Sequence, residues 1–337
     1  IAGKLADHQL DAMLLASQAG ERYAVGFHGE GLVLVTREGA HYSTDSRYIE
    51  AARQEVQGAQ VELVTRERGH LALAAGYLQE HGLKRVGFES GAVSVDALVP
   101  AQDLPDGLRA SKDGEELAAM EKAQRITDEA FQAILNFIRP GQTEREVAAR
   151  LVYELLRRGG ERVSFDPIVA AGANGSKPHA VPGDTVIQPG MFVTMDFGCV
   201  WRGYCSDMTR TVAVGKPAPE MERVYQVVLE AQQAGIAAAR AGLAGREIDA
   251  AGRTVIQAAG YGEAFSHSFG HSLGLEIHES PNAAPGEERI MPVGAVVSAE
   301  PGIYLPGRFG VRIEDVIVLS ETGCRDLTKS PKELIVL

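Results

Sequence analysis

Along the first hundred residues, short apolar runs alternate with stretches whose apolar residues recur every three or four positions. Apolar runs of roughly four to eight residues are typical of buried strands, and the longer period is typical of amphipathic helices. The expected strands cover residues 31–36, 59–64 and 85–90, and the expected helices cover residues 45–56 and 69–82. Strands that alternate with helices predict a small α/β domain, which we place at residues 1–110.

The pattern changes after this region. Residues 102–116 are polar and contain Pro105, Gly107 and Gly114, which predicts a linker that runs into the start of a helix. Long amphipathic stretches follow, and glycine or proline residues mark several of their ends. They predict helices over residues 114–138, 143–158, 219–241 and 245–259. We therefore expect a second domain over residues 111–337.

This second region contains an internal repeat. A shift of 101 residues aligns Arg139, Gly141, Arg145, Glu146, Val147, Ala149 and Gly159 with Arg240, Gly242, Arg246, Glu247, Ile248, Ala250 and Gly260. The strand-like segments 190–198 and 294–302 also align. The acids that match are Asp196 with Glu300 and, further on, Asp207 with Glu314. Two helices followed by a hairpin, written twice, predict an α+β domain with pseudo-twofold symmetry.

The repeated acids create an electrostatic problem. If hairpins turn around residues 200–203 and 306–308, Asp196 lies opposite Asp207, and Glu300 lies opposite Glu314. Opposed side chains on a hairpin have Cβ atoms about 5 Å apart, where two bare charges repel by about 3 kcal/mol at an effective dielectric of about 20. A cation between them, or a shared proton, removes the repulsion. Solvated strand faces are the alternative, but these strands are otherwise apolar.

The cysteines near Asp207 offer a competing interpretation as a redox or metal couple. Strand parity places Cys205 on the face of Asp207 and Cys199 on the opposite face, so we expect no disulfide between them. Three cysteines in a chain of this length also argue against a disulfide framework. We expect all three thiols, including that of Cys324, to be free.

Histidines cluster in residues 266–281, which contain His267, His271 and His278. No H-E-x-x-H motif occurs, so zincin chemistry is not indicated. His179 stands alone in a loop rich in glycine and proline, and by itself it is typical of a surface residue. Four carboxylates and one imidazole describe an oxygen-rich site for two divalent ions, for which Mn²⁺ is more natural than a structural Zn²⁺. Paired ions typically serve hydrolysis.

Composition narrows the class of protein further. The net charge of −12 and a pI near 5.3 disfavour a nucleic-acid surface, and no run of Lys or Arg offers an anchor to anionic lipid. The longest apolar runs are strand-sized, and the first residues lack the features of a signal peptide. We expect a cytoplasmic protein without a membrane or nucleic-acid partner.

At this point the residues resemble a known family. Asp196, Asp207, His271, Glu300 and Glu314, together with the segments HSFGHSLGLEIHE and GVRIED, resemble the pita-bread metallopeptidases, which include methionine aminopeptidase, aminopeptidase P and prolidase. The resemblance covers residues 112–337. The first hundred residues are similar to the creatinase/prolidase N-terminal domain, which favours the Xaa-Pro branch over methionine aminopeptidase.

The resemblance implies a role for each motif residue. It implies that two divalent metal ions are bound by Asp196, Asp207, His271, Glu300 and Glu314. Glu300 would also accept a proton from the bridging water. His267 and His278 would contact the scissile carbonyl and the substrate proline, and His179 would stabilise the tetrahedral intermediate. Arg312 lies two residues before Glu314, so strand parity places it on the same face, where it would orient the site. Ser268 replaces the glycine that follows the first histidine in the family. Because no metal ligand is replaced, a metal-free activity of the creatinase type is disfavoured.

The leading hypothesis is a proline dipeptidase (prolidase) that hydrolyses the Xaa-Pro imide bond and acts as a homodimer with Mn²⁺, with Co²⁺ or Zn²⁺ as alternatives. The carboxylate of a dipeptide would select for an arginine, and Arg47 is our candidate, acting in cis or across the dimer. Arg47 could equally be a helix-start residue paired with Asp45 or Glu50. Aminopeptidase P, which acts on longer peptides, is the first alternative. A methionine aminopeptidase and a binding protein that has lost catalysis are more remote.

Overall fold

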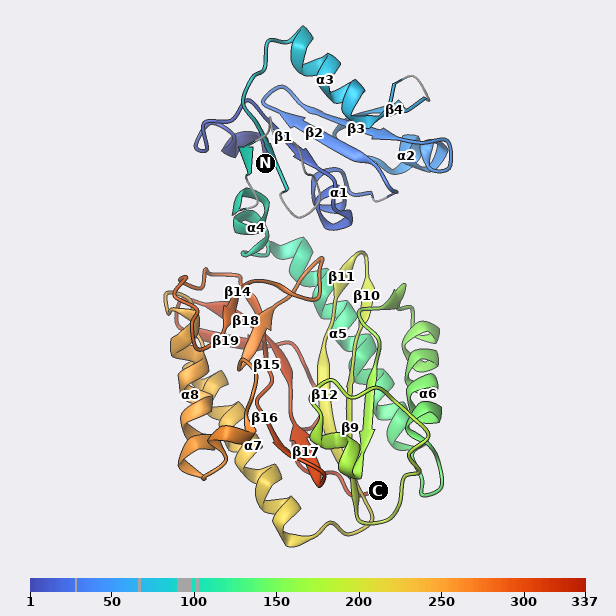
Figure 1. Ribbon diagram of the computed structural model, residues 1–337, viewed down its shortest axis with the longest axis vertical. Helices are drawn as coiled ribbons and strands as arrows, with labels where there is room; N and C mark the ends of the chain where they lie inside the picture. Colours follow the sequence, from blue (N-terminus) through green and yellow to red (C-terminus); the bar gives the residue numbers. More distant parts are fainter. Residues whose placement is uncertain (28, 66–67, 90–98, 101–102) are drawn as a thin grey trace. The chain divides into compact units, whose positions relative to one another are not determined.

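A computed structural model describes residues 1–27, 29–65, 68–89, 99–100 and 103–337. These residues form two compact units, unit 1 over Ile1–Arg109 and unit 2 over Ala110–Leu337 (Figure 1). Residues 90 and 102, which belong to the predicted strand 85–90 and the predicted linker 102–116, lie outside the described residues.

Unit 1 contains a six-stranded mixed sheet with the strand order β4-β3-β2-β1-β5-β6. The strands are β1 (Ala12–Leu15), β2 (Leu32–Thr36), β3 (Ala40–Thr44), β4 (Ala59–Leu63), β5 (Val86–Phe88) and β6 (Val99–Pro100). The helices are the 3₁₀ turn η1 (Ala2–Lys4), α1 (Gln18–Val25), α2 (Ile49–Glu55), α3 (His70–Glu80) and α4 (Asp103–Arg109). The observed β2, β4, β5, α2 and α3 match the five elements predicted in this region.

Helices cover both faces of this sheet. In β1, Met13 and Leu15 join a core that includes residues of α1, α2 and α4, whereas Ala12 and Leu14 join a second core with α3. Residues 12–15 of β1 and residues 32–35 of β2 are unbroken apolar runs, as a strand covered on both faces requires. The sequence pattern predicted β2 but did not predict β1, β3 or α1. The prediction of a linker over residues 102–116 is partly wrong, because residues 103–109 form the helix α4, which buries Leu104.

Unit 2 holds the two predicted repeats. Its helices are α5 (Gly114–Leu135), α6 (Glu144–Arg157), α7 (Pro219–Ala238) and α8 (Gly245–Ala258), with the 3₁₀ turns η2 (Gly172–Ser176) and η3 (Gly262–Ala264). The strands of the first half are β7 (Arg162–Val163), β8 (Ile168–Ala171), β9 (Met191–Phe197), β10 (Cys199–Trp201), β11 (Tyr204–Cys205) and β12 (Met208–Val214). The strands of the second half are β13 (Gly270–Ser272), β14 (Glu279–Ala283), β15 (Val296–Ala299), β16 (Gly302–Leu305), β17 (Phe309–Arg312), β18 (Asp315–Ser320) and β19 (Gly323–Asp326). Within the described parts of the chain, no helix is both long enough and apolar enough to cross a membrane.

Backbone geometry confirms that the sequence repeat is a structural repeat. Gly141 and Gly242, which the shift of 101 residues aligns, both have positive φ angles, 94° and 85°. Their amides make equivalent bonds, since the Gly141 N–H donates to the Ile187 carbonyl and the Gly242 N–H donates to the Met291 carbonyl, each at 2.9 Å. A side chain at such a φ would be strained, which explains why glycine occupies both positions. The pseudo-twofold α+β fold is therefore confirmed.

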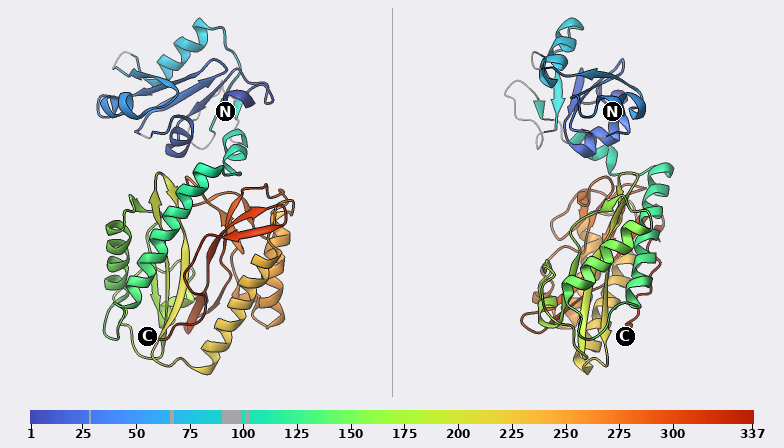
Figure 2. Two further views of the ribbon diagram at one scale, coloured as in Figure 1. Left: turned by 180° about the vertical axis from the view of Figure 1, so that it is seen from behind. Right: turned by 90° about the vertical axis from the view of Figure 1, so that its right-hand side faces the viewer.

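Each helix pair packs on its own half of the strand layer. Residues of α5 and α6 form one core with β8, β9 and β12, and residues of α7 and α8 form another with strands of the second half, including β15, β17 and β18. Figures 1 and 2 show α6 and the α7–α8 pair at opposite edges of unit 2, while α5 crosses the back of the layer. The acidic residues of both repeats lie within or directly beside the strands of these cores.

The first hairpin has a different register from the predicted one. Asp196 pairs with Thr209 rather than Asp207, because the turn lies at Arg202–Gly203, one position later than expected. Both turn residues have positive φ, 49° and 82°, as tight two-residue hairpins require. The resulting slip of two residues preserves side-chain parity, so Asp207 still lies on the face of Asp196.

The second hairpin has the predicted register. Ala299 pairs with Asp315 on one side and Gly302 pairs with Arg312 on the other, which sets Glu300 level with Glu314. These two acids lie at the break between the β15–β18 and β16–β17 ladders. The turn lies at residues 306–308, as expected.

Arg210, on β12, joins the two halves of unit 2 from inside. The side chain is buried, and its Nη2 lies 2.7 Å from Asp315 Oδ1 at the start of β18. The guanidinium also donates to the backbone carbonyls of Glu314, Ser330 and Pro331. Removing one partner of a buried ion pair leaves an uncompensated charge, which is strongly destabilising.

We expect Arg210→Ala to destabilise unit 2 by about 3–5 kcal/mol, because Asp315 then keeps a buried charge with one fewer partner. Trp201, the single tryptophan, lies in unit 2, so its fluorescence during urea unfolding reports on that unit. The matched control is Arg308→Ala, which removes an arginine from an exposed pair with Glu220 and should leave the midpoint near that of the wild type. Equal midpoint shifts for the two variants would contradict this assignment.

Candidate metal and substrate site

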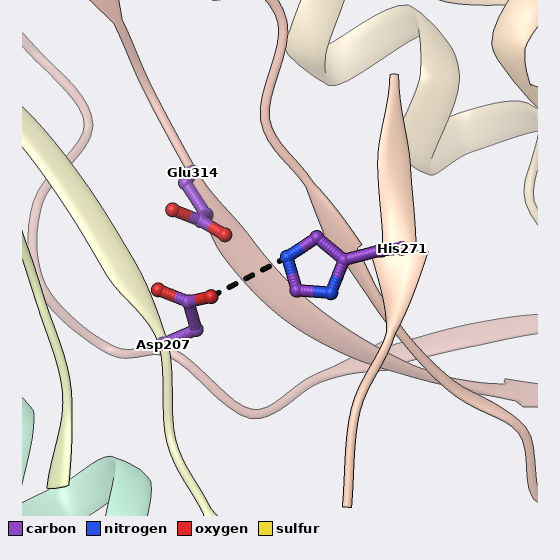
Figure 3. A group of neighbouring side chains, drawn as sticks. All are labelled: Asp207, His271 and Glu314. Atoms are coloured by element: carbon purple, nitrogen blue, oxygen red, sulfur yellow. Dashed lines mark ion pairs between the residues drawn. The ribbon is translucent and has the colours of Figure 1, made fainter. Parts of the chain in front are cut away.

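Three side chains from different strands converge in unit 2. One ligand atom each from Asp207, His271 and Glu314 lies within 4.8 Å of the others (Figure 3). Asp207 lies just before β12, His271 lies in β13, and Glu314 lies just before β18. Among the described residues, no other group of three acidic, histidine or cysteine side chains meets this spacing. The sequence-predicted ligands from both repeats are therefore brought together.

The histidine presents one nitrogen to the acids. His271 Nδ1 lies 3.1 Å from the Ser272 carbonyl oxygen, which can only accept, so Nδ1 carries the proton. Nε2 then has a free lone pair, and it lies 3.5 Å from both Asp207 Oδ2 and Glu300 Oε1. A carbonyl that fixes the tautomer of an imidazole in this way is typical of metal-binding histidines.

Several buried carboxylate oxygens lack a partner. Asp196 Oδ1, Asp207 Oδ1 and Glu314 Oε1 make no hydrogen bond to the described residues. Burial, followed by repulsion from neighbouring acids, raises the pKa values of Asp207 and Glu314 well above their ordinary range. Unpaired buried carboxylates are costly unless they bind a proton or a cation. These oxygens, with the imidazole, suit divalent ions with a preference for oxygen ligands.

Arg312 connects the acids of both halves. This side chain is only 3% exposed, and its Nη2 donates to Asp196 Oδ2 at 2.6 Å. Its Nε donates to Thr209 Oγ1 at 3.0 Å, and the Thr209 hydroxyl donates to Glu314 Oε2 at 2.7 Å. The arginine predicted as an orienter by strand parity therefore holds one acid directly and a second through Thr209.

His267 lies at the other end of this network. Its Nδ1 donates to the Ser268 carbonyl at 2.8 Å, which leaves Nε2 to accept from the Tyr304 hydroxyl at 2.9 Å. Tyr304 in turn accepts from Arg312 Nη1 at 2.7 Å. Burial lowers the pKa of His267 below its ordinary value, which favours the neutral ring.

A cavity of about 550 Å³ opens onto this cluster. All nine site residues predicted in unit 2 line it: Asp196, Asp207, His271, Glu300, Glu314, His179, His267, His278 and Arg312. His179 and His278 are exposed. The ring centroids of His278 and His271 lie 4.4 Å apart. The apolar part of the wall consists of Phe165, Pro167, Ile168, Pro178, Ala180, Val181, Pro182 and Ile277. This cavity therefore combines an acidic floor with walls suited to a small apolar ring.

Arg47 belongs to unit 1. It pairs with Asp45 and with Glu30, and 61% of its side chain is exposed. Of the two alternative partners that the sequence offered, Asp45 and Glu50, the structure has the pair with Asp45, and Glu30 is a further partner that the sequence did not suggest. The role of Arg47 in substrate binding stays a prediction.

The sequence reasoning missed three polar residues that support the acids. Thr209 and Tyr304 bind Arg312, and Ser298 Oγ donates to Glu300 Oε1 at 3.1 Å. Strand parity could have found two of them, since Thr209 lies two residues after Asp207 and Ser298 lies two residues before Glu300. The three cysteines are free thiols, as predicted.

Comparison with protein families gives two matches that together span most of the chain. The model of metallopeptidase family M24 matches residues 118–321. The model of the Creatinase/Prolidase N-terminal domain matches residues 1–119. The first match includes every residue of the acidic cluster.

Relatives and solved structures agree with these matches. The Bacillus subtilis protein named uncharacterized peptidase YqhT is 43% identical, and the alignment covers 97% of this chain and 96% of that protein. The Xaa-Pro dipeptidase from Bacillus anthracis has a TM-score of 0.94 at 40% identity, over 99% of this chain and 97% of that one. The X-Pro aminopeptidase from Thermotoga maritima has a TM-score of 0.91 at 34% identity, over 98% of both chains.

The raised carboxyl pKa values predict how pH affects the metal-free protein. Asp207 and Glu314 have ordinary pKa values of 3.8 and 4.5, and both values are higher in the folded state. The folded state therefore binds more protons, so the stability from these groups is full below their ordinary values and is lost as pH rises through the raised ones. We expect the chelated protein to have a lower Tm at about pH 8 than at about pH 5.

The control is Glu314→Gln, which removes one of the buried acids and should reduce the fall in Tm. Added Mn²⁺ should raise the Tm of the wild type more at about pH 8 than at about pH 5, because the metal competes with protons for the same oxygens. A fall of equal size in the wild type and in Glu314→Gln would show that other groups cause it.

Proposed function

The chain belongs to metallopeptidase family M24, and on this premise we propose that it hydrolyses the bond between an N-terminal residue and a following proline. The observation that carries the proposal is the buried cluster of Asp207, His271 and Glu314 at an apolar cavity, with carboxylate oxygens left unpaired. Relatives named Xaa-Pro dipeptidase and Xaa-Pro aminopeptidase support the same bond specificity.

Divalent metal ions fit the acidic floor of the cavity. Asp196, Asp207, His271, Glu300 and Glu314 would hold two ions, and we propose Mn²⁺ because four of the five donors are carboxylates. Such ions activate water as a nucleophile and stabilise the oxyanion that develops at the scissile carbonyl.

The protein's own groups move the protons and position the substrate. Glu300, which is held by the Ser298 hydroxyl, would accept a proton from the attacking water and pass it to the prolyl nitrogen. His267, kept neutral by burial and oriented by Tyr304, would contact the substrate from one side. At the exposed side of the cavity, His278 would contact the scissile carbonyl or the substrate proline, and His179 would stabilise the tetrahedral intermediate.

Proline specificity follows from the chemistry of the bond. An Xaa-Pro bond has no N–H, so its recognition depends on shape more than on a hydrogen bond to the leaving nitrogen. Phe165, Ile168 and Ile277 are among the apolar residues that would face the proline ring and the preceding side chain. A methionine aminopeptidase, by contrast, would have to cleave peptides without proline.

Two further features of the proposal concern assembly and location. We propose a homodimer in the cytoplasm, as expected from the sequence. A binding protein that has lost catalysis is disfavoured, because all five ligand residues line one cavity.

The central test separates metal binding from proton transfer. Chelation should abolish hydrolysis of Ala-Pro-Ala, and Mn²⁺ should restore it. Glu300→Gln should reduce kcat by about 100-fold or more, because a general base contributes on that scale. The surface variant Glu220→Gln, a carboxylate change remote from the cavity, is the control and should retain activity.

Metal content measured on the same samples decides what Glu300 does. Retained metal with lost kcat supports proton transfer, whereas loss of metal along with activity assigns Glu300 to ligation alone. A chain that binds no divalent metal and cleaves no Xaa-Pro peptide would overturn the proposed function.

A further inference from the structure

The backbone around His267 is held by an ion pair on helix α8. Arg253 makes a two-point contact with Asp249, in which Nε lies 2.7 Å from Oδ2 and Nη2 lies 2.8 Å from Oδ1. The Asp249 side chain is 2% exposed, and that of Arg253 is 18% exposed. Neither belongs to the described residues that line the cavity of about 550 Å³. Any influence of this pair on the reaction therefore acts through the residues that it binds.

The arginine extends this pair to the backbone on both sides of Ser266. Arg253 Nη2 donates to the His267 carbonyl at 2.7 Å, and Nη1 donates to the Phe265 carbonyl at 3.2 Å. The guanidinium also lies 4.2 Å from the centroid of the Phe265 ring, and this ring packs edge-to-face with the His267 ring. One guanidinium therefore restrains the segment through two carbonyls and an aromatic face.

The aspartate reaches the imidazole of His267 through one peptide plane. Asp249 Oδ1 accepts the Phe269 N–H at 2.9 Å. This N–H and the Ser268 carbonyl belong to the same planar peptide unit, and the Ser268 carbonyl accepts from His267 Nδ1 at 2.8 Å. The bond to Asp249 therefore orients the carbonyl that keeps the proton on Nδ1.

Comparison of the two repeats separates this pair from the requirements of the fold. The shift of 101 residues aligns Asp249 and Arg253 of α8 with Ala148 and Val152 of α6. A charged pair needed to pack a helix on the strand layer would be expected in both repeats. The repeat that carries His267 has the pair, whereas the other has apolar residues, so the pair serves the segment 265–269 rather than the repeated fold.

We propose that Asp249 and Arg253 are positioning residues for His267, and that they fix the orientation and the tautomer of its imidazole at the cavity. The inference rests on the proposed function, in which His267 contacts the substrate. With the proton on Nδ1, Nε2 is the acceptor that meets the Tyr304 hydroxyl. A turn of the peptide plane at Ser268 would remove the acceptor of Nδ1 and release the ring. A displacement of about 1 Å at a reacting centre lowers a rate by as much as about 100-fold.

A double-mutant cycle on the Mn²⁺-loaded full chain tests the inference with Ala-Pro-Ala as substrate. Asp249→Ala and Arg253→Lys should each lower kcat by about 10- to 100-fold without loss of metal. Asp249→Asn keeps an oxygen for the Phe269 N–H and should recover part of this loss. In the His267→Ala background the same substitutions should have little further effect, because changes that act through one shared residue are not additive.

Arg150→Ala is the matched control. Arg150 pairs with the buried Glu154 at a spacing of four residues on α6, the equivalent helix of the first repeat. Its loss removes the same kind of ion pair and should leave kcat unchanged.

A second measurement reports the tautomer of His267 without a substrate. In the chelated full chain with ¹⁵N-labelled histidine, the ring ¹⁵N chemical shifts should show the Nδ1-protonated form, and the His267→Ala spectrum identifies the signals. Asp249→Ala should shift the population toward the Nε2-protonated form, and Arg253→Lys should do so to a smaller extent.

The two measurements keep the inference apart from the proposed function. Additive losses in the His267→Ala background, or an unchanged tautomer in the Asp249 and Arg253 variants, overturn the inference and leave the proposed function intact. If Asp249→Ala does not fold, Arg253→Lys carries both measurements. Failure of the metal-loaded wild type to cleave Ala-Pro-Ala sinks the proposed function, and the tautomer then still decides whether the pair positions His267.

Discussion

Mutual repulsion among buried carboxylates is the constraint on which the structure of unit 2 depends. Asp207 and Glu314 are almost fully buried, and neighbouring acids raise the pKa values of both. No arrangement of hydrophobic residues compensates for such a cluster, because buried charges need counter-charges or protons. Hydrogen bonds from the surrounding polar groups compensate for part of this charge. The carboxylate oxygens that lack a partner are the positions at which a cation would bind.

The acids and the exposed histidines of the cavity lie on different kinds of element. The acids lie within or directly beside strands that pack on two separate helix-backed cores. His179 and His278 lie in loops on the exposed side of the same cavity. A metal site requires fixed distances between ligands, whereas contacts to a substrate tolerate adjustment. The division of residues between strands and loops matches these two requirements.

Much of this arrangement could be predicted from the sequence, because repetition and strand parity do not depend on details of packing. Parity placed Arg312 with Glu314 and separated Cys199 from Cys205. The register of the first hairpin could not be predicted, since one residue's difference in the turn moved the partner of Asp196 from Asp207 to Thr209. The helix α4 was missed because polar residues with proline and glycine are typical of linkers, and its burial of Leu104 depends on tertiary contacts. The partners of Arg47 likewise depend on which side chains meet in space.

Residues 330–337 contact the first repeat, which affects when that repeat can finish folding during synthesis. Ile335 and Leu337 pack on the core of the first repeat, and their backbones bond to Ala213 on β12. Arg210 similarly binds carbonyls at Ser330 and Pro331. A ribosome must therefore synthesise more than 110 residues after β12 before the first repeat acquires its final edge contacts. The helices and the hairpin of the first repeat are synthesised early, but these contacts can form only after the second repeat has been synthesised. The two repeats therefore complete their tertiary structure at the same stage.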